Sequence, residues 1–133
     1  WDDWNLRVVN TRHTVQNLGL RLEAGSPTKV FCYSGDGMFT PTASKLYTNA
    51  DLLVHEAYTR DGTVKNPRGE TITIGTKTHC SLQQLERLDD MARPKKMALI
   101  HLNRKLREEK KDILKKYRQR RWIMPDAGEV IEL

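Results

Sequence analysis

The sequence is poor in cysteine, in aromatic residues and in long apolar runs. Its two cysteines, Cys32 and Cys80, lie far apart and form no C-x-x-C pair. They give no basis for a disulfide framework and favour a reducing compartment, so we expect a cytoplasmic protein. Apolar runs such as Met97–Ile100 are far shorter than the roughly 18 residues that a membrane-spanning helix needs. We therefore expect neither a disulfide-rich secreted domain nor a membrane-spanning protein.

The length of the chain fits one domain. It has 133 residues, of which 38% are hydrophobic and 30% are charged. That is enough to bury one core and too little for two. No internal repeat or flexible linker interrupts it, so we expect a single domain over residues 1–133. The first residue is Trp1 and not Met, from which we expect a chain cut at its N-terminus.

Positive charge is concentrated in one segment. The net charge is +6, and residues 104–121 contain ten Lys or Arg against three Asp or Glu, whereas the rest of the chain is nearly neutral. A basic helix of this kind can bind the phosphates of a nucleic acid or can bind a partner protein. The plainer alternative is a solvated amphipathic helix, because Leu106, Ile113, Leu114 and Tyr117 form an apolar stripe that would dock on a core.

The order of the expected elements is strands first, then strands alternating with helices. Alternating or continuous apolar patterns predict strands at 6–9, 18–22, 30–33, 52–55, 71–74, 97–101, 122–124 and 129–132. Helices are expected at 41–49, at 104–121, and from Ser81, which has a capping-box partner in Gln84, to a stop at Pro94. This order predicts an α/β (or α+β) fold with a mixed sheet.

Polar side chains follow several of the apolar strands. His55, Glu56 and His101 stand at the ends of such strands, and His13 and Asp36 come just after two others. The carboxyl ends of strands are where open α/β sheets collect their ligands. Each residue alone is compatible with a structural role, such as a turn at Asp36, and it is their recurrence that favours a site. Imidazole and carboxylate together suit zinc, so His13, Asp36 and His101 are candidate ligands.

Several short motifs, taken in order, resemble those of the metallo-β-lactamase superfamily, and within it the tRNase Z and arylsulfatase-like branch. These motifs are Tyr33–Gly37, Ala50–Ala57, His79–Ser81, Leu99–Leu102 and the closing turn at 126–129. They resemble the Gly-Asp-Thr turn, the His-Glu-Ala-Thr strand end, the His-Ser-Thr helix start, the Thr-His strand end and the final Asp-Gly turn of that branch. The spacing between them also matches, and His13 resembles the histidine that precedes a Gly-Tyr-Arg strand.

The resemblance implies roles for five residues. His13 and Asp36 would bind a first metal, Asp36 would bridge to a second, and His101 would bind that second metal. Glu56 and His79 would form a catalytic pair that stabilises the developing charge or protonates the leaving oxygen. A carboxylate beside an imidazole is expected to favour its charged form. The cofactor would be Zn²⁺, two per complete site, with Mn²⁺ or Fe²⁺ as alternatives, and the reaction would be hydrolysis of a phosphodiester or sulfate ester.

One absence limits this expectation. The superfamily's main metal motif, His-x-His-x-Asp-His, occurs nowhere in the chain. The chain therefore resembles the C-terminal half of a four-layer αββα sandwich, with helices on one face of its sheet. Its expected partners are the N-terminal half of the same fold and an ester substrate, or a second copy that covers the same apolar sheet face. The alternative from another class is a non-catalytic module that binds nucleic acid or protein through the basic helix at 104–121.

Overall fold

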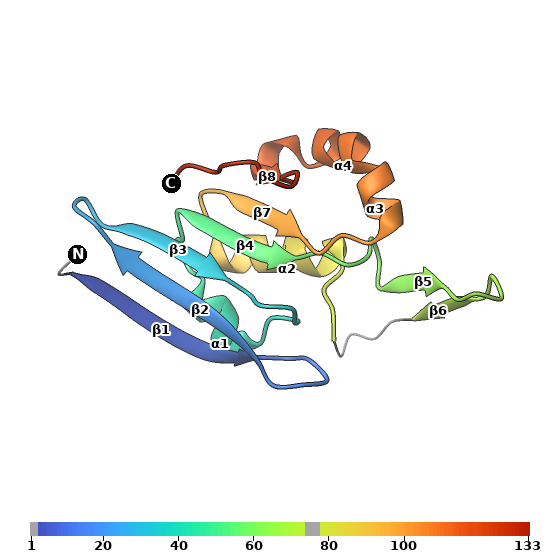
Figure 1. Cartoon of the computed structure of the whole chain (residues 1–133), viewed down its shortest axis with the longest axis horizontal. Helices are drawn as coiled ribbons and strands as arrows, with labels where there is room; N and C mark the ends of the chain where they lie inside the picture. The colour runs from blue at the N-terminus through green and yellow to red at the C-terminus, as the bar shows by residue number, and fades with distance from the viewer. Residues whose placement is uncertain (1–2, 74–77) are drawn as a thin grey trace.

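A six-stranded mixed sheet forms the body of the chain, with its helices gathered on one face (Figure 1). The computed structural model describes residues 3–73 and 78–133. The strands are β1 (Trp4–Thr11), β2 (Asn17–Ala24), β3 (Lys29–Tyr33), β4 (Leu52–Glu56), β5 (Thr63–Lys65), β6 (Thr71–Thr73), β7 (Met97–Ile100) and β8 (Trp122–Ile123). The helices are α1 (Pro41–Leu46), α2 (Leu82–Ala92), α3 (Arg104–Glu108) and α4 (Lys110–Lys116), followed by the 3-10 turn η1 (Arg118–Arg120).

The main sheet has the strand order β1-β2-β3-β4-β7-β8. Strands β1, β2 and β3 pair antiparallel, whereas β3, β4, β7 and β8 run parallel to one another. The carboxyl ends of β3, β4 and β7 therefore meet at the same edge of the sheet. Strands β5 and β6 form a separate hairpin that projects from that end (Figure 1).

One face of the sheet packs against the helices. Residues paired across neighbouring strands share a face, so the register places Cys32, Leu53 and Met97 together. All three are fully buried in one apolar cluster with Leu85 and Leu88 of α2. Helices α3 and α4 extend the same layer, because Tyr117 donates a hydrogen bond to Glu86 in α2. The expected mixed sheet with helices on one face is confirmed.

The opposite face of the sheet is apolar, and it is open at β1. Its β1 residues Trp4, Leu6 and Val8 are 60%, 48% and 58% exposed. Their neighbours in β2 include Leu20 and Leu22, which the register places on the same face. In the part of the chain that is described, no helix covers these residues (Figure 1). The expectation of an apolar sheet face that this chain leaves uncovered is therefore met.

Helix α2 begins and ends as its sequence predicts. The Ser81 side chain accepts a hydrogen bond from the Gln84 backbone N–H, and Gln84 in turn accepts one from the Ser81 backbone N–H. This reciprocal cap fixes the start of the helix beside His79. The helix ends at Ala92, where Arg93 takes the left-handed conformation with φ 50° and directly precedes Pro94.

Two expectations about the C-terminal part are wrong, and one strand was missed. Residues 104–121 form not one helix but α3, α4 and η1, broken at Glu109, whose backbone leaves the helical region and whose carboxylate accepts a hydrogen bond from Arg60. The break lets the segment bend around the sheet edge. The strand expected at 129–132 is absent, because residues 126–129 close a turn that leaves Val130 exposed without a neighbouring strand. Strand β5 was too short to be recognised in the sequence.

No helix among the residues that the structure describes is both long and apolar enough to cross a bilayer. This agrees with the short apolar runs of the sequence.

Candidate metal centre

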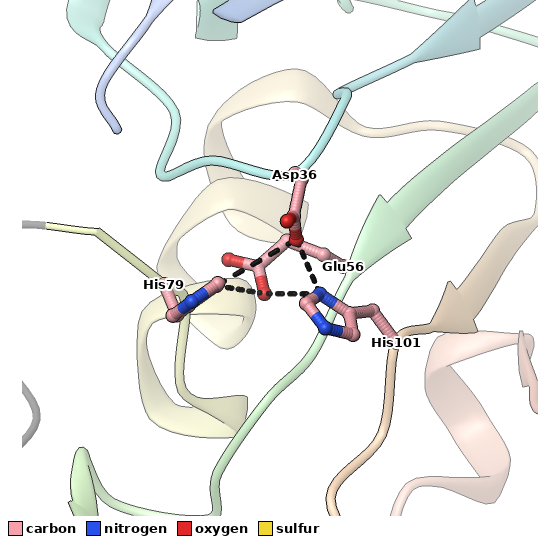
Figure 2. A group of neighbouring side chains, drawn as sticks. All are labelled: Asp36, Glu56, His79 and His101. Atoms are coloured by element: carbon pink, nitrogen blue, oxygen red, sulfur yellow. Dashed lines mark hydrogen bonds and ion pairs between the residues drawn. The ribbon is translucent and has the colours of Figure 1, made fainter. Parts of the chain in front are cut away.

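Four side chains from four different segments meet at the carboxyl edge of the parallel strands (Figure 2). Glu56 is the last residue of β4, His101 directly follows β7, Asp36 lies in the loop after β3, and His79 comes just before α2. One potential ligand atom from each of the four lies within 4.8 Å of the others. The parallel order of the sheet thus brings together residues that are far apart in the sequence.

Glu56 is fixed in place by its own hydrogen bonds. Its side chain is fully buried, one oxygen accepts a hydrogen bond from the Cys80 backbone N–H, and Oε2 lies 3.2 Å from Nδ1 of His79. Burial is the main cause that raises the pKa of this carboxyl to about 8, and the negative charge of Asp36 adds to it. Glu56 therefore favours the protonated form at neutral pH in the absence of a metal.

His79 differs from expectation in its electrostatics. Burial lowers the pKa of its imidazole, and the neighbouring His101 and His13 lower it further, while only Asp36 opposes them. Glu56 does not charge His79 as expected, because the same burial keeps Glu56 protonated. At neutral pH the Glu56–His79 pair thus holds one proton between a neutral carboxyl and a neutral imidazole.

Asp36 faces two sides of the group with its two oxygens. Its Oδ1 pairs with Nδ1 of His101 and lies 3.7 Å from Nδ1 of His79. Its Oδ2 lies 3.9 Å from Nε2 of His13. The carboxylate is half exposed, at 51%, so it is open to a ligand from solvent. A carboxylate that offers one oxygen to each side has the arrangement needed to bridge two cations.

His13 lies at the border of the four-residue group. An antiparallel bridge between Arg12 and Met38, with N–H to O distances of 2.8 and 2.9 Å, holds the end of β1 against the loop that carries Asp36. The ring of His13 consequently meets the ring of His79 edge-on, with centroids 5.2 Å apart. The structure thus brings all five predicted site residues together.

His101 has an unusual backbone conformation. Its φ is +53°, in the left-handed region that residues with a Cβ seldom adopt. Such a conformation costs on the order of 1 kcal/mol or more and tends to be retained where a side chain must be aimed at a site. Here it aims the imidazole at Asp36 (Figure 2).

Asn17 is a positioning residue that the sequence did not reveal. Its amide nitrogen donates hydrogen bonds to Thr11 and to the backbone oxygen of Ser34, and its Oδ1 accepts one from the Asp36 N–H at 3.1 Å. The loop passes so close that a Cβ added to Gly35, whose φ is +66°, would lie 2.7 Å from the Asn17 side chain. No local motif marks Asn17, since its role depends on the pairing of β1 with β2.

Tyr58 is a second residue that sequence reasoning missed. Its ring stacks on His79 with centroids 4.7 Å apart and lies 5.3 Å from the ring of His101. On its other side it lines a pocket of about 770 Å³ between β5, β6 and the start of α3. The sequence does mark this position, because Tyr58 stands where the His-Glu-Ala-Thr motif of the branch that the chain resembles has threonine.

His55 and Cys80 adjoin the site without facing it. Strand alternation turns His55 into the helix-covered core, where its ring packs edge-on to Phe39 and Tyr47 and burial lowers its pKa to about 4. Burial likewise raises the pKa of the Cys80 thiol to about 12. Both side chains are therefore neutral packing groups near pH 7.

The donor set has the chemistry of a transition-metal site. Two carboxylates and two imidazoles within 4.8 Å, with a third imidazole beside them, are ligand types that Zn²⁺ prefers and that Mn²⁺ and Fe²⁺ also accept. Because the Asp36 carboxylate is half exposed, a metal bound between it and the imidazoles of His79 and His101 would be reachable from solvent. The residues present therefore fit a bound divalent metal.

Comparison with known proteins shows the fold. No family model and no curated protein sequence matches the chain. The structure is similar to the short form of human tRNase Z, ELAC1 (TM-score 0.61, 22% identity), over 80% of this chain and 40% of that one. It is similar to YhfI, a metallo-β-lactamase fold protein of Bacillus subtilis (TM-score 0.61, 19% identity), over 84% and 44%. An isothiocyanate hydrolase from Delia radicum gut bacteria matches 99% of this chain and 55% of its own (TM-score 0.68, 12% identity).

These likenesses establish that the chain has part of the metallo-β-lactamase fold. The chain spans about half the length, or less, of the solved proteins it resembles.

Proposed function

We propose that this chain, which has part of the metallo-β-lactamase fold, is the C-terminal half of a metal-dependent hydrolase that cleaves a phosphodiester or a sulfate ester. The observation that carries the proposal is the convergence of Asp36, Glu56, His79 and His101 within 4.8 Å at the carboxyl edge of the sheet. The likeness to hydrolases of the same fold supports it.

Asp36 and His101 would hold the metal together with His13. Asp36 offers Oδ1 to the side of His101 and Oδ2 to the side of His13, which suits a bridge between the two ions of a complete site. The bound metal would supply an activated water and polarise the ester oxygen. These three ligands are too few to complete two ions, so the remaining ligands would come from an upstream segment with the His-x-His-x-Asp-His motif.

Glu56 and His79 would handle the proton of the leaving group. The pair holds one proton between Oε2 and Nδ1, which are 3.2 Å apart. Because Glu56 is itself anchored by the Cys80 N–H, the imidazole has a fixed orientation. It would give its Nε2 proton to the leaving oxygen and take up the Glu56 proton at Nδ1. General acid catalysis of this kind contributes about 10²–10⁴-fold to a rate. The pocket lined by Tyr58 adjoins the pair and would receive part of the substrate.

The first experiment is a zinc titration of the purified chain in competition with a chromophoric chelator. We expect the wild type to bind Zn²⁺ and Asp36→Asn to bind it at least about 10-fold more weakly, because the carboxylate that faces both sides is lost. The matched control is Asp126→Asn, an exposed carboxylate that pairs only with Lys110 among the described residues. Equal affinity in all three proteins, or no zinc bound by the wild type, would count against the site.

The second experiment tests the reaction in a longer chain that includes the upstream metal motif. The probes are bis(p-nitrophenyl) phosphate and p-nitrophenyl sulfate, and the isolated 133-residue chain is the inactive reference. We expect Glu56→Gln and His79→Asn to lower kcat by about 10²-fold or more with zinc affinity less affected. Unchanged kcat in both variants would remove the proposed acid pair.

A further inference from the structure

A groove of about 870 Å³ lies at the far end of α2 from the candidate metal centre. It is formed by the C-terminal turn of α2 and the segment after it on one side, and by the end of α4 with η1 on the other. Helix α2 has 11 residues and starts beside His79, so at about 1.5 Å per residue the two ends are roughly 16 Å apart. The groove is thus separate from the site described above.

The groove is lined by cations that have no acidic partner. Arg93, Lys115, Lys116, Arg118 and Arg121 all line it and are all exposed. Within residues 3–73 and 78–133, none of these five forms an ion pair with a carboxylate. Because like charges repel, gathering them along one groove costs free energy that a bound anion would recover.

The acidic side chains at the groove are already occupied. Asp89 and Asp90 are its only carboxylates among the described residues, and Arg120 Nη1 donates to them at 3.0 and 2.7 Å. Arg120 therefore offsets one of their two negative charges, and the other lining cations still outnumber the one that remains. The same guanidinium donates to the backbone oxygen of Glu86, which ties η1 to α2.

The two apolar residues that line the groove are both buried. Tyr117 is buried, hydrogen-bonds Glu86 and stacks on Trp122 with centroids 4.5 Å apart. Pro94, the other apolar lining residue, is buried as well. The groove therefore offers neither an exposed aromatic ring on which a base could stack nor an apolar side chain that could enter a bilayer.

We propose that this groove binds the sugar-phosphate backbone of a nucleic acid, independently of base sequence. Three of the five unpaired cations are arginines, whose planar fork matches phosphate oxygens. A concave row of cations suits a strand that carries one charge per nucleotide, whereas a membrane surface favours a flat basic face with apolar residues. Because no exposed aromatic ring lines the described part of the groove, we expect no preference among bases.

The test is fluorescence anisotropy of the purified chain with a labelled RNA strand of about 20 nucleotides, at several salt concentrations. The groove variant combines Arg93→Gln, Arg118→Gln and Arg121→Gln. The matched control removes the same charge outside the groove with Lys29→Gln, Arg107→Gln and Lys111→Gln, which are exposed residues of β3, α3 and α4. A second groove variant, Lys115→Gln with Arg118→Gln, leaves the left-handed positions Arg93 and Arg121 unchanged in case the first fails to fold.

We expect the triple groove variant to bind RNA at least 10-fold more weakly than the wild type, and the control less than about 3-fold. Its slope of log K against log salt should fall by about 2, since each lost phosphate contact removes about 0.7 for a single strand. Two strands of different base sequence should bind equally. Equal losses in groove and control variants, or binding to phosphatidylserine vesicles without binding to RNA, would overturn the proposal. No metal is needed, so this result is independent of the proposed hydrolase activity.

Discussion

The two faces of the sheet are made of similar residues and have opposite surroundings. Leu53 and Met97 point to the helices and are fully buried, whereas Leu6 and Val8 are equally apolar and about half exposed. Burial of apolar surface is the main source of stability in a small domain. The helix-covered face therefore holds the chain together, and the open face is apolar for a reason other than the stability of this chain alone.

The candidate metal centre lies at the strand ends, where neighbouring residues of one strand enter different surroundings. Neighbouring residues of β4 point to opposite faces, so His55 enters the helix-covered core while Glu56 reaches the site at the strand end. A partner on the open face would bury apolar surface and could bring ligands to Asp36 in the same step.

The sharpest test of the contrast is the same substitution on each face. Leu53→Ala should lower the free energy of unfolding by about 2–5 kcal/mol, because it leaves a cavity in the core. Leu6→Ala should change it by less than about 1 kcal/mol, because that side chain is already 48% exposed. Urea unfolding measures both. Losses of equal size would mean that the two faces are equally buried in solution.

The stability of the helix-covered core should also depend on pH, through His55. Burial lowers the pKa of the folded-state imidazole to about 4, whereas in the unfolded chain it is near 6.5. Between these values the unfolded state binds a proton that the folded state does not, so stability falls as the pH drops from 6.5 to 4. The whole loss is on the order of 3 kcal/mol.

His55→Asn should remove this part of the acid sensitivity. The asparagine amide can still donate to the backbone oxygen of Glu56, as Nδ1 of His55 does at 2.8 Å. His101→Asn is the matched control, because it removes a half-exposed histidine and keeps His55. The measurement is the free energy of unfolding from urea titrations between pH 4 and 7. An acid limb that persists in His55→Asn would assign the sensitivity to other groups.

Much of the fold could be predicted from local patterns. The capping box at Ser81 and the apolar runs of β3, β4 and β7 fix their elements through contacts close in the sequence. The strand ends also pointed to Asp36, Glu56 and His101, because parallel strands bring their carboxyl ends together whatever lies between them.

What could not be predicted depends on contacts between distant segments. Asn17 acts through the loop after β3, and the break at Glu109 coincides with its hydrogen bond to Arg60. The periodicity of residues 104–121 was real, but periodicity does not show where a helix must bend around a sheet edge. The charge state of His79 was misjudged for the same reason, since burial of both partners is a property of the assembled site.

A smaller effect is expected from two glycines that have positive φ. Gly35→Ala and Gly128→Ala both add a Cβ at positive φ, +66° and +85°, which costs each about 1 kcal/mol. Only at Gly35 does the new carbon also meet Asn17 at 2.7 Å, whereas nothing lies within 4 Å at Gly128. We therefore expect a total loss of about 2–3 kcal/mol for Gly35→Ala against about 1 kcal/mol for Gly128→Ala, and a weaker hold on zinc in Gly35→Ala alone. Unfolding titrations and the chelator competition read these two effects separately.

A double substitution on the open face should change the stability least and the self-association most. Leu6→Thr with Val8→Thr places two threonines in β1, and threonine is a β-branched residue that strands favour. The free energy of unfolding should therefore shift by less than about 1 kcal/mol. The apolar face they belong to is of the kind that proteins normally cover. Sedimentation velocity should therefore show concentration-dependent association of the wild type that the double variant weakens. Arg104→Gln with Lys111→Gln, exposed and away from this face, should leave it unchanged. A wild type that stays monomeric at all concentrations would show that the open face does not pair with its own copy.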